Sequence, residues 1–189
     1  MTDYVYIDLD NVYSVLRQRD DMKEEGIPKA IRRIVKQAFA AISFSGYVKV
    51  FGNFRYLPND IIDRITYTTR DWIYVDTPFI NQHGKTCADG KIMAEILMDV
   101  DDFDRCILFT SDVDFYPMAE ALIEKGCEVI VVSCGNVSPH LVKSCTQFIP
   151  VVQWGDVYFG TKTKSKYRKR ETLKMTKEVD TIQEEYPLY

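Results

Sequence analysis

The chain has 189 residues, of which 46% are hydrophobic, and a formal net charge of −4. This length allows one globular domain with an appendage but not two independent domains, and the hydrophobic content excludes a largely disordered protein. No window approaches the roughly 20 apolar residues of a membrane span, and acidic residues interrupt the apolar N-terminal run, so we expect a cytoplasmic protein without membrane contact.

Strand-like and helix-like segments alternate along the chain. The run "YVYID" has no helical period and predicts a buried strand, whereas "IPKAIRRIVKQAFAAI" carries its apolar residues on one side, as a helix does. Strands are expected at 4–8, 47–53, 72–79, 105–110, 127–134 and near 147–152. Helices are expected at about 11–19, 27–42, within 59–68, at 88–99, at 115–126 and near 138–145, and a loop at 81–85. This alternation predicts a three-layer α/β/α sandwich, Rossmann-like, with a mostly parallel central sheet.

The last part of the chain loses the apolar periodicity and separates its charges. Residues 161–177 hold eight Lys or Arg and one Glu, and residues 178–189 hold four acidic residues and no basic one. We therefore predict a domain over 1–156 and a C-terminal arm over 157–189, basic and then acidic, that is partly helical or flexible.

The cysteines and histidines carry no metal signature. The cysteines are odd in number and form no CxxC pair, and His83 and His140 do not have zinc-ligand spacing. We interpret the five cysteines as buried thiols.

Acidic residues follow two of the predicted strands. Asp8 and Asp10 end the first strand, and Asp112 and Asp114 come directly after the fourth. Ligands of an open α/β sheet bind at the carboxyl ends of its strands, where the strand order reverses, and in either common order these two strands are neighbours there. Four aspartates would repel one another unless a cation lay between them, and Mg²⁺ or Mn²⁺ prefers such oxygen ligands. The pattern therefore favours metal-assisted phosphate chemistry.

Helix capping is the alternative explanation of these residues. The residues suited to cap the two following helices are Asp10, Asn11, Ser111, Asp112 and Asp114. A functional role is favoured for Asp8, which lies behind an apolar run where no cap is needed, and for Asp112. For Asp10 and Asp114 both interpretations stay open.

The predicted helix over 88–99 supplies further acidic residues. Asp89 lies in its first turn, where the helix dipole also favours an anion. Glu95 and Asp99 are roughly 120° and 80° around the helix from Asp89, so the three cannot face one point. We predict that Asp89 belongs to the site, with Glu95 and Asp99 as accessory or solvated residues.

These segments resemble the NYN domain family, a branch of the PIN-like ribonuclease superfamily. The resemblance covers about residues 3–150 and rests on "VYIDLDNVY", "GKTCADGKIMAEILMD" and "ILFTSDVDFYPMAEALIEKGCEVIVVS". Its most specific parts are the "SDVDF" turn with the helix after it, and the "KTCAD" entry to the preceding helix.

The resemblance implies a PIN-like fold and a metal-dependent endoribonuclease. An acidic pocket would bind Mg²⁺ or Mn²⁺ and hydrolyse RNA phosphodiesters, leaving a 5′-phosphate and a 3′-hydroxyl. The residues assigned to catalysis and to the metal are Asp8, Asp89, Asp112 and Asp114. Asn11 occupies the family's asparagine position, and Asp10 departs from the family pattern. The accessory residues are Asp10, Asn11, Ser111, Glu95 and Asp99.

RNA, single-stranded or structured, is the expected partner, and basic residues would guide its backbone. The candidates are Lys85 before Asp89, the stripe Lys29, Arg32, Arg33 and Lys36 on the 27–42 helix, and Lys164, Lys166, Arg168, Lys169 and Arg170 in the arm, with Tyr167 as a stacking residue. A solvated helix face and a solubilising tail are the alternatives. The preference for RNA over DNA rests on the resemblance alone, and a homodimer stays open.

Two other functions stay open. A non-catalytic RNA-binding or regulatory scaffold would keep the pocket and act through partners. A haloacid-dehalogenase-like phosphatase would use the first aspartate of "DLDN" as its nucleophile. Val12 and Tyr13 stand where that group has a threonine or similar residue, and no cap-domain insert is apparent.

Overall fold

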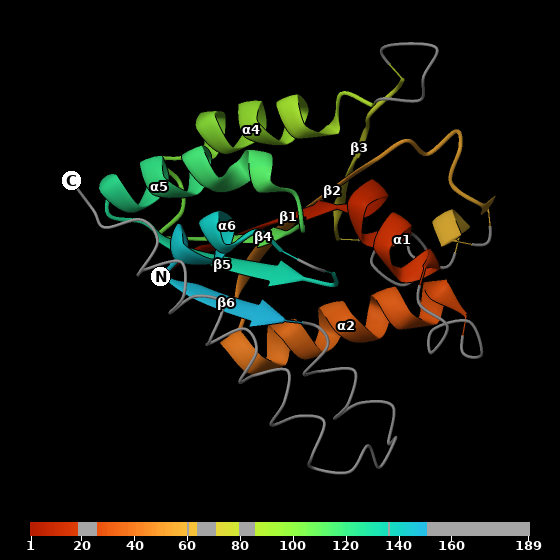
Figure 1. Cartoon of the computed structure of the whole chain (residues 1–189), viewed down its shortest axis with the longest axis horizontal. Helices are drawn as coiled ribbons and strands as arrows, with labels where there is room; N and C mark the ends of the chain where they lie inside the picture. Colours follow the sequence, from red (N-terminus) through yellow and green to blue (C-terminus); the bar gives the residue numbers. More distant parts are fainter. Residues whose placement is uncertain (19–25, 60, 64–70, 80–85, 136, 151–189) are drawn as a thin grey trace. The chain divides into compact units, whose positions relative to one another are not determined.

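The computed structural model describes residues 1–18, 26–59, 61–63, 71–79, 86–135 and 137–150. They form a six-stranded sheet in the order β3-β2-β1-β4-β5-β6, with every neighbouring pair parallel (Figure 1). The strands are β1 (Asp3–Asp8), β2 (Gly46–Gly52), β3 (Ile73–Asp76), β4 (Arg105–Phe109), β5 (Glu128–Ser133) and β6 (Gln147–Pro150). The predicted α/β class and parallel sheet are confirmed.

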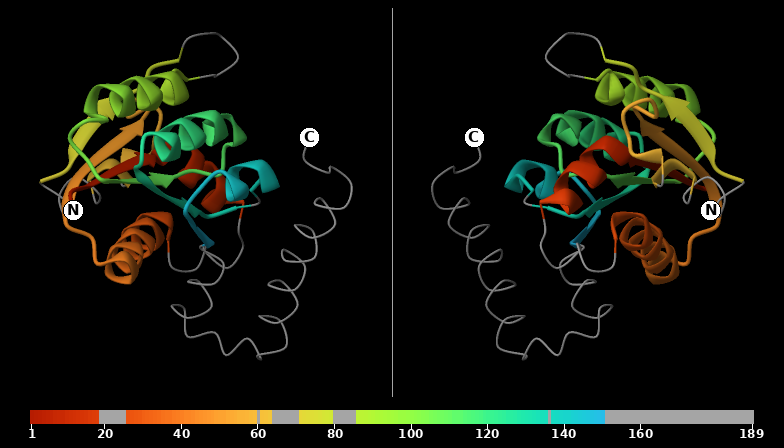
Figure 2. Two further views of the ribbon diagram at one scale, coloured as in Figure 1. Left: turned by 90° about the vertical axis from the view of Figure 1, so that its left-hand side faces the viewer. Right: turned by 90° about the vertical axis from the view of Figure 1, so that its right-hand side faces the viewer.

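Helices cover both faces of this sheet. They are α1 (Leu9–Arg17), α2 (Ile27–Ile42), α4 (Ala88–Asp99), α5 (Tyr116–Glu124) and α6 (Pro139–Lys143), with a 3₁₀ turn, η2 (Val113–Phe115), before α5. Figures 1 and 2 show α2 on one face and α4 and α5 on the other. Several predictions lie outside the described residues: the loop at 81–85, residues 60 and 64–68 of the helix expected within 59–68, the domain boundary at 156 and the arm.

Two predicted helix starts were wrong by a turn or less. Helix α1 begins at Leu9 rather than near Asn11, because Asp8 at the end of β1 caps it. The helix expected over 115–126 is preceded by η2, which Asp112 caps, and ends at Glu124. After β1 the chain turns directly into α1, whereas residues 110–112 separate β4 from η2.

Helix α2 matches its predicted bounds because its pattern is entirely local. Pro28 stands in its first turn, where no backbone donor is needed, and Ser43 ends it with a left-handed φ of 51°. Its buried residues are Ala30, Ile31, Ile34, Val35, Ala38 and Ile42, which form one face toward the sheet.

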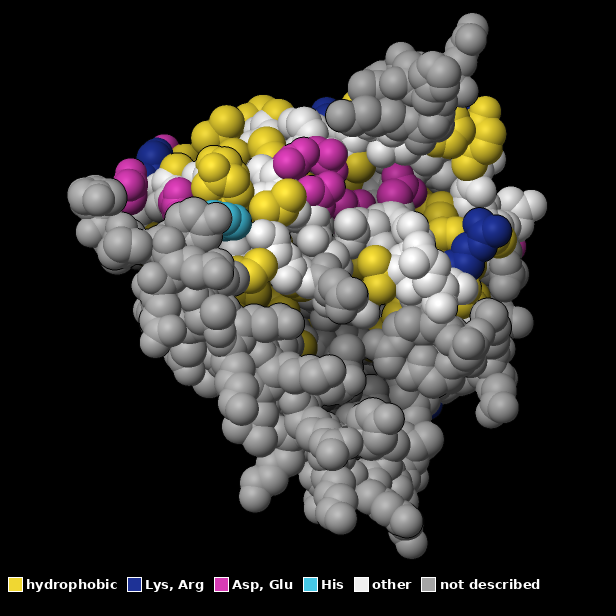
Figure 3. All heavy atoms as spheres, viewed as in Figure 1, with side chains coloured by type: hydrophobic (Ala, Val, Ile, Leu, Met, Phe, Trp, Pro, Cys, Tyr) yellow, Lys and Arg dark blue, Asp and Glu magenta, His cyan; other side chains and the backbone are white. Residues whose placement is uncertain are grey.

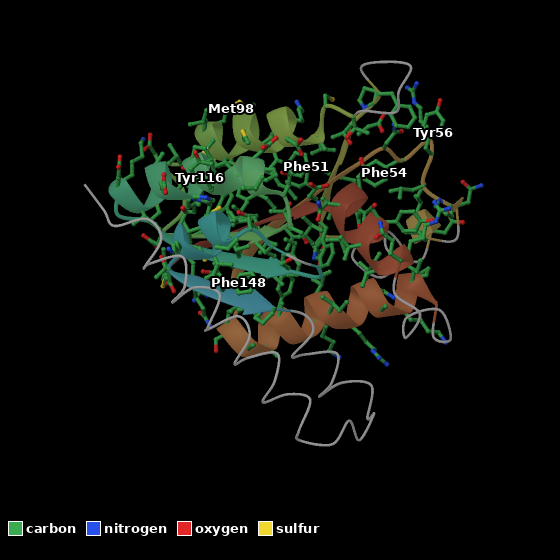
Figure 4. The ribbon with its side chains drawn as sticks, viewed as in Figure 1. Phe51, Phe54, Tyr56, Met98, Tyr116 and Phe148 are labelled. Carbon is green, nitrogen blue, oxygen red and sulfur yellow. The ribbon has the colours of Figure 1, made fainter. Side chains whose placement is uncertain are left out.

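The core lies on both sides of β4 and β5, which are buried along almost their whole length. Such strands read as continuous apolar runs because helices cover both faces of the sheet. Between the sheet and α4, Phe51 packs in one cluster with Tyr6, Ile92 and Ile96, and Figure 4 shows it in the interior. These contacts hold the start of α4 beside the ends of β1 and β4.

A buried ion pair joins β1 and β4 at their amino ends. Arg105 donates from Nε and Nη2 to the two carboxylate oxygens of Asp3 at 2.8 and 2.7 Å, and Asp3 is 1% exposed. Nη2 also donates to the Ile42 carbonyl, and the Ser45 N–H donates to Asp3. The pair therefore aligns the two strands whose other ends carry the acidic residues.

The five cysteines differ in burial. Cys106 and Cys134 are buried, Cys87, Cys127 and Cys145 are half-buried, and all five are free. Burial raises the pKa of Cys145 to about 11.

None of the helices in the described part of the chain has the length and apolar character needed to cross a membrane.

Candidate metal centre

Asp8 ends β1 and turns the chain into α1. Its side chain is 3% exposed, and its Oδ1 accepts the backbone N–H of Asn11 at 3.0 Å. Burial raises the pKa of Asp8 to about 7; the Asn11 N–H opposes this, and the charges of Asp89, Asp10 and Asp112 add to it. A carboxylate in this position needs a neighbouring cation to remain ionised at neutral pH.

Three other carboxylates meet beyond the ends of β1 and β4. One oxygen from each of Asp89, Asp112 and Asp114 lies within 4.8 Å of the others. Asp89 comes from the first turn of α4, whose N-cap is Cys87, and Asp114 lies in η2. Figure 3 shows acidic side chains gathered at the surface over the right-hand ends of α4 and α5. This spacing suits a divalent cation that keeps some of its waters.

Asp112 both caps η2 and faces the site. Its Oδ1 accepts the Asp114 N–H at 2.9 Å, and its own N–H donates to Thr110 Oγ1 at 3.1 Å. Capping and membership of the acidic site are alternatives from the sequence, and Asp112 combines them. The expectation that no cap is needed at Asp8 was wrong, because Asp8 caps α1 and also lines the cavity. Because the cap fixes the backbone of the turn, Asp112 and Asp114 are held toward Asp89.

A cavity of about 240 Å³ connects Asp8 to this cluster. Its lining residues are Asp8, Asp10, Asn11, Ser14, Thr86, Ala88, Asp89 and Asp112. The cavity lies at the β1/β4 boundary, where α1 leaves the sheet toward one face and α5 toward the other. Residues more than 100 positions apart therefore line one concave surface, as the strand-order argument predicts.

Asp10 is turned toward β2 rather than toward the cluster. Its two oxygens accept the Asn53 N–H at 3.0 and 3.2 Å, and the Thr77 hydroxyl donates to it at 3.5 Å. Burial raises its pKa. Asp10 thus accepts hydrogen bonds from the chain just beyond β2, and it is neither a helix cap nor one of the three clustered carboxylates.

Asn11 and Ser111 join the two acidic turns. The Ser111 N–H donates to Asn11 Oδ1 at 2.9 Å, and the Ser111 and Ser133 hydroxyls are 2.7 Å apart. Asn11 also donates its own N–H to Asp8. The asparagine therefore positions the turn after β1 against the turn after β4.

Glu95 and Asp99 are absent from the cavity lining and are paired elsewhere. Lys49 on β2 donates to Glu95 at 2.8 Å and to Asp99 at 2.6 Å, and the Tyr6 hydroxyl donates to Asp99 at 2.7 Å. The sequence did not reveal Lys49 as their partner, since it stands inside an apolar strand. These two acidic residues anchor α4 to the sheet.

The predicted basic residues lie apart from the cavity or outside the described residues. Lys29 and Lys36 are exposed on α2, and Arg32 and Arg33 are half-buried there. None of the described lining residues of the acidic cavity comes from α2. Lys85 and the arm residues Lys164, Lys166, Arg168, Lys169 and Arg170 lie outside the described residues.

Sequence reasoning missed the residues beside the acidic cavity. Arg17 of α1, Tyr56 after β2 and Phe79 after β3 line a neighbouring cavity. The strand-end rule, applied to β2 and β3, places the segments after them at the same edge of the sheet but does not show that Tyr56 and Phe79 are in contact.

Comparison with known proteins gives a family and a fold. The family model of the NYN domain matches residues 4–152. A crystal structure of a protein of unknown function from Vibrio parahaemolyticus aligns with a TM-score of 0.63 and 17% identity, over 79% of this chain and 92% of that one. At this identity the likeness shows the fold alone. A comparison with curated proteins gave no match.

Proposed function

Since the chain belongs to the NYN domain family, as its motifs predicted, we propose that it is a metal-dependent ribonuclease acting through Asp8, Asp89, Asp112 and Asp114. The observation that carries this proposal is the meeting of three carboxylate oxygens within 4.8 Å beside the buried Asp8. The family match supports a nuclease-like fold, and the acidic cluster supports a site for phosphodiester hydrolysis.

The residues present fit Mg²⁺ or Mn²⁺. All the clustered donors are carboxylate oxygens, which these hard cations prefer, and no His or Cys belongs to the cluster among the described residues. Asp89, Asp112 and Asp114 would hold the ion, whereas Asp8, also predicted as a ligand, lies outside these three clustered carboxylates. When bound, the ion would activate a water for attack and stabilise the charge that develops on the phosphoryl group.

The protein's own groups would position the reactants. Asp8 Oδ1 is occupied by the Asn11 N–H, which leaves Oδ2 as the atom that receives a proton from the attacking water. Burial raises the pKa of Asp8 above that of an exposed aspartate, which makes its carboxylate a stronger proton acceptor. The Asp112 cap and the Asn11–Ser111 hydrogen bond would keep the acidic turns in place while the backbone of the RNA lies across the cavity.

The test is cleavage of end-labelled single-stranded RNA, and of DNA of the same sequence, in Mg²⁺, Mn²⁺ or EDTA. We expect metal-dependent cleavage of RNA that is lost in Asp89→Asn and Asp112→Asn. Asp102→Asn removes one exposed charge from the connection between α4 and β4, away from the cavity, and should remain active.

Two outcomes would favour the alternatives. Salt-dependent RNA binding without cleavage in any metal would support the scaffold and contradict the proposed catalysis. A phosphomonoester substrate assayed in parallel tests the phosphatase, because turnover of that substrate with no cleavage of RNA would replace the nuclease proposal.

A further inference from the structure

A larger cavity, of about 650 Å³, adjoins the acidic one. The two share the lining residues Asp10, Ser14 and Thr86, so they are neighbours at the same edge of the sheet. The walls of the larger cavity come from α1, from the chain after β2, and from Phe79 and Thr86, which form a β-bridge with each other. A polymer whose phosphate lies in the acidic cavity therefore has a second space beside it.

Two aromatic rings line this larger cavity and remain accessible. Tyr56 is 69% exposed and Phe79 is 38% exposed, yet their ring centroids are only 4.3 Å apart. Figure 4 shows Tyr56 at the surface, beyond the ends of the strands. The two rings are tilted at 48° to each other, so each presents its own apolar face, and a nucleobase of any type can stack on one of them.

Asn53 supplies an independent indication of a ligand. It is 2% exposed, and its backbone N–H is held by Asp10 at 3.0 Å, so its position is fixed. Its side-chain Oδ1 and Nδ2 are buried and have no hydrogen-bond partner among the described residues, although the residue lines the larger cavity. A buried amide without partners is unfavourable unless a ligand or water satisfies it.

The side-chain amide of Asn53 and the charge of Arg17 indicate the chemical class of the ligand. An asparagine amide offers a donor and an acceptor side by side, the arrangement that matches the polar edge of a nucleobase. Arg17, exposed in the last turn of α1, places a positive charge at the same cavity of an otherwise acidic domain. The aromatic rings and the amide suit a nucleobase, and the guanidinium of Arg17 suits the phosphate attached to it.

We propose that the larger cavity binds one unpaired nucleobase of the RNA strand whose phosphate lies in the acidic cavity. This inference rests on the proposed function and adds a base subsite to it, because a base whose polar edge is bound by Asn53 cannot at the same time pair within a duplex. Single-stranded RNA, or a loop, is then the substrate.

The experiment measures binding separately from cleavage. Oligoribonucleotides with 2-aminopurine at successive positions are titrated in EDTA, and the fluorescence of the probe reports stacking. We expect one position to be quenched on binding by the wild type. The Tyr56→Ala/Phe79→Ala double variant should lose this quenching and bind about 10-fold more weakly or worse. The matched control is Tyr47→Ala, an exposed tyrosine at the other end of β2, which should behave as the wild type.

A second variant and two competitors complete the test. Asn53→Leu keeps the approximate shape of the side chain, so it should unfold at a temperature near that of the wild type and lose any preference among oligo(A), oligo(U) and oligo(C). A duplex of the same sequence and free AMP should both compete poorly. Competition by AMP as strong as that by the oligonucleotide would overturn the assignment to a strand.

The outcomes separate this inference from the proposed function. If the double variant binds and cuts RNA as the wild type does while Asp112→Asn is inactive, the base site is overturned and the nuclease stands. If no protein cuts RNA but the quenching depends on Tyr56 and Phe79, the base site stands and the catalysis fails.

Discussion

The side-chain oxygen of Asn11 accepts a hydrogen bond from the backbone N–H of Ser111 at 2.9 Å, across 100 residues of sequence. The same asparagine donates its backbone N–H to Asp8. One residue therefore links the turn after β1 to the turn after β4, and the acidic residues of both turns depend on it.

We expect Asn11→Ala to reduce RNA cleavage by about 10- to 100-fold, mainly in kcat, because the acidic turns lose their common anchor. The Ser111 N–H would be left without its acceptor, which should lower the free energy of unfolding by about 1–3 kcal/mol. Cleavage kinetics and urea unfolding measure the two effects. Asn59→Ala, which removes an exposed amide, is the control, and equal activity of the two variants would contradict the positioning role.

The stability of the metal-free protein should depend on pH through Asp8. Its pKa is raised from 3.8 to about 7 in the folded state, so between these values the folded protein holds a proton that the unfolded chain has released. Stability from this group is complete below about pH 4 and is lost as the pH rises through about 7, by an amount on the order of 4 kcal/mol.

Urea unfolding in EDTA from pH 5 to pH 8 checks this expectation. Asp8→Asn cannot ionise, so it should gain stability relative to the wild type as the pH rises. Asp10, whose pKa is also raised by burial, remains in both proteins, so its own burial contributes to both pH profiles. Parallel pH profiles of the two proteins would show that Asp8 is not the titrating group.

A divalent cation should stabilise the folded protein, because it offsets the mutual repulsion of the clustered carboxylates. At 100 times its dissociation constant, Mg²⁺ or Mn²⁺ should add about 2.7 kcal/mol to the free energy of unfolding. Thermal unfolding with and without EDTA measures this effect. Asp89→Asn should lose most of the increase and Asp102→Asn should keep it; an equal increase in both variants would place the ion elsewhere.

The buried pair of Asp3 and Arg105 should matter for stability and not for the chemistry. Arg105→Met leaves the Asp3 carboxylate buried without its cation, which should lower the free energy of unfolding by about 3–5 kcal/mol. The double variant Asp3→Asn/Arg105→Met should be more stable than the sum of the single effects predicts. Cleavage per folded molecule should not change, because the pair lies at the amino ends of the strands. Additive losses in this cycle would mean that the two side chains do not stabilise each other.

Local patterns predicted where helices and strands lie, although some ends differ: the strand expected over 72–79 covers only Ile73–Asp76. The bounds of α2 and α4 agree with the prediction because the residues that form an apolar helical face lie within about a dozen positions of one another. The meeting of Asp8 with Asp112 also followed from the sequence, since parallel strands carry their ends to one edge and the predicted order makes these two strands neighbours.

The partners of individual polar side chains were decided only by the tertiary structure. The sequence left Asp10 as a helix cap or a metal ligand, but in the folded protein it accepts the backbone N–H of Asn53. Glu95 and Asp99 contact Lys49 only because α4 crosses β2. The cavity at Tyr56 and Phe79 likewise forms from separate turns. Residue type and periodicity determine which residues are buried and on which element. Hydrogen bonds and carboxylate clusters depend on ångström-scale distances between elements, and those distances arise only when the layers pack.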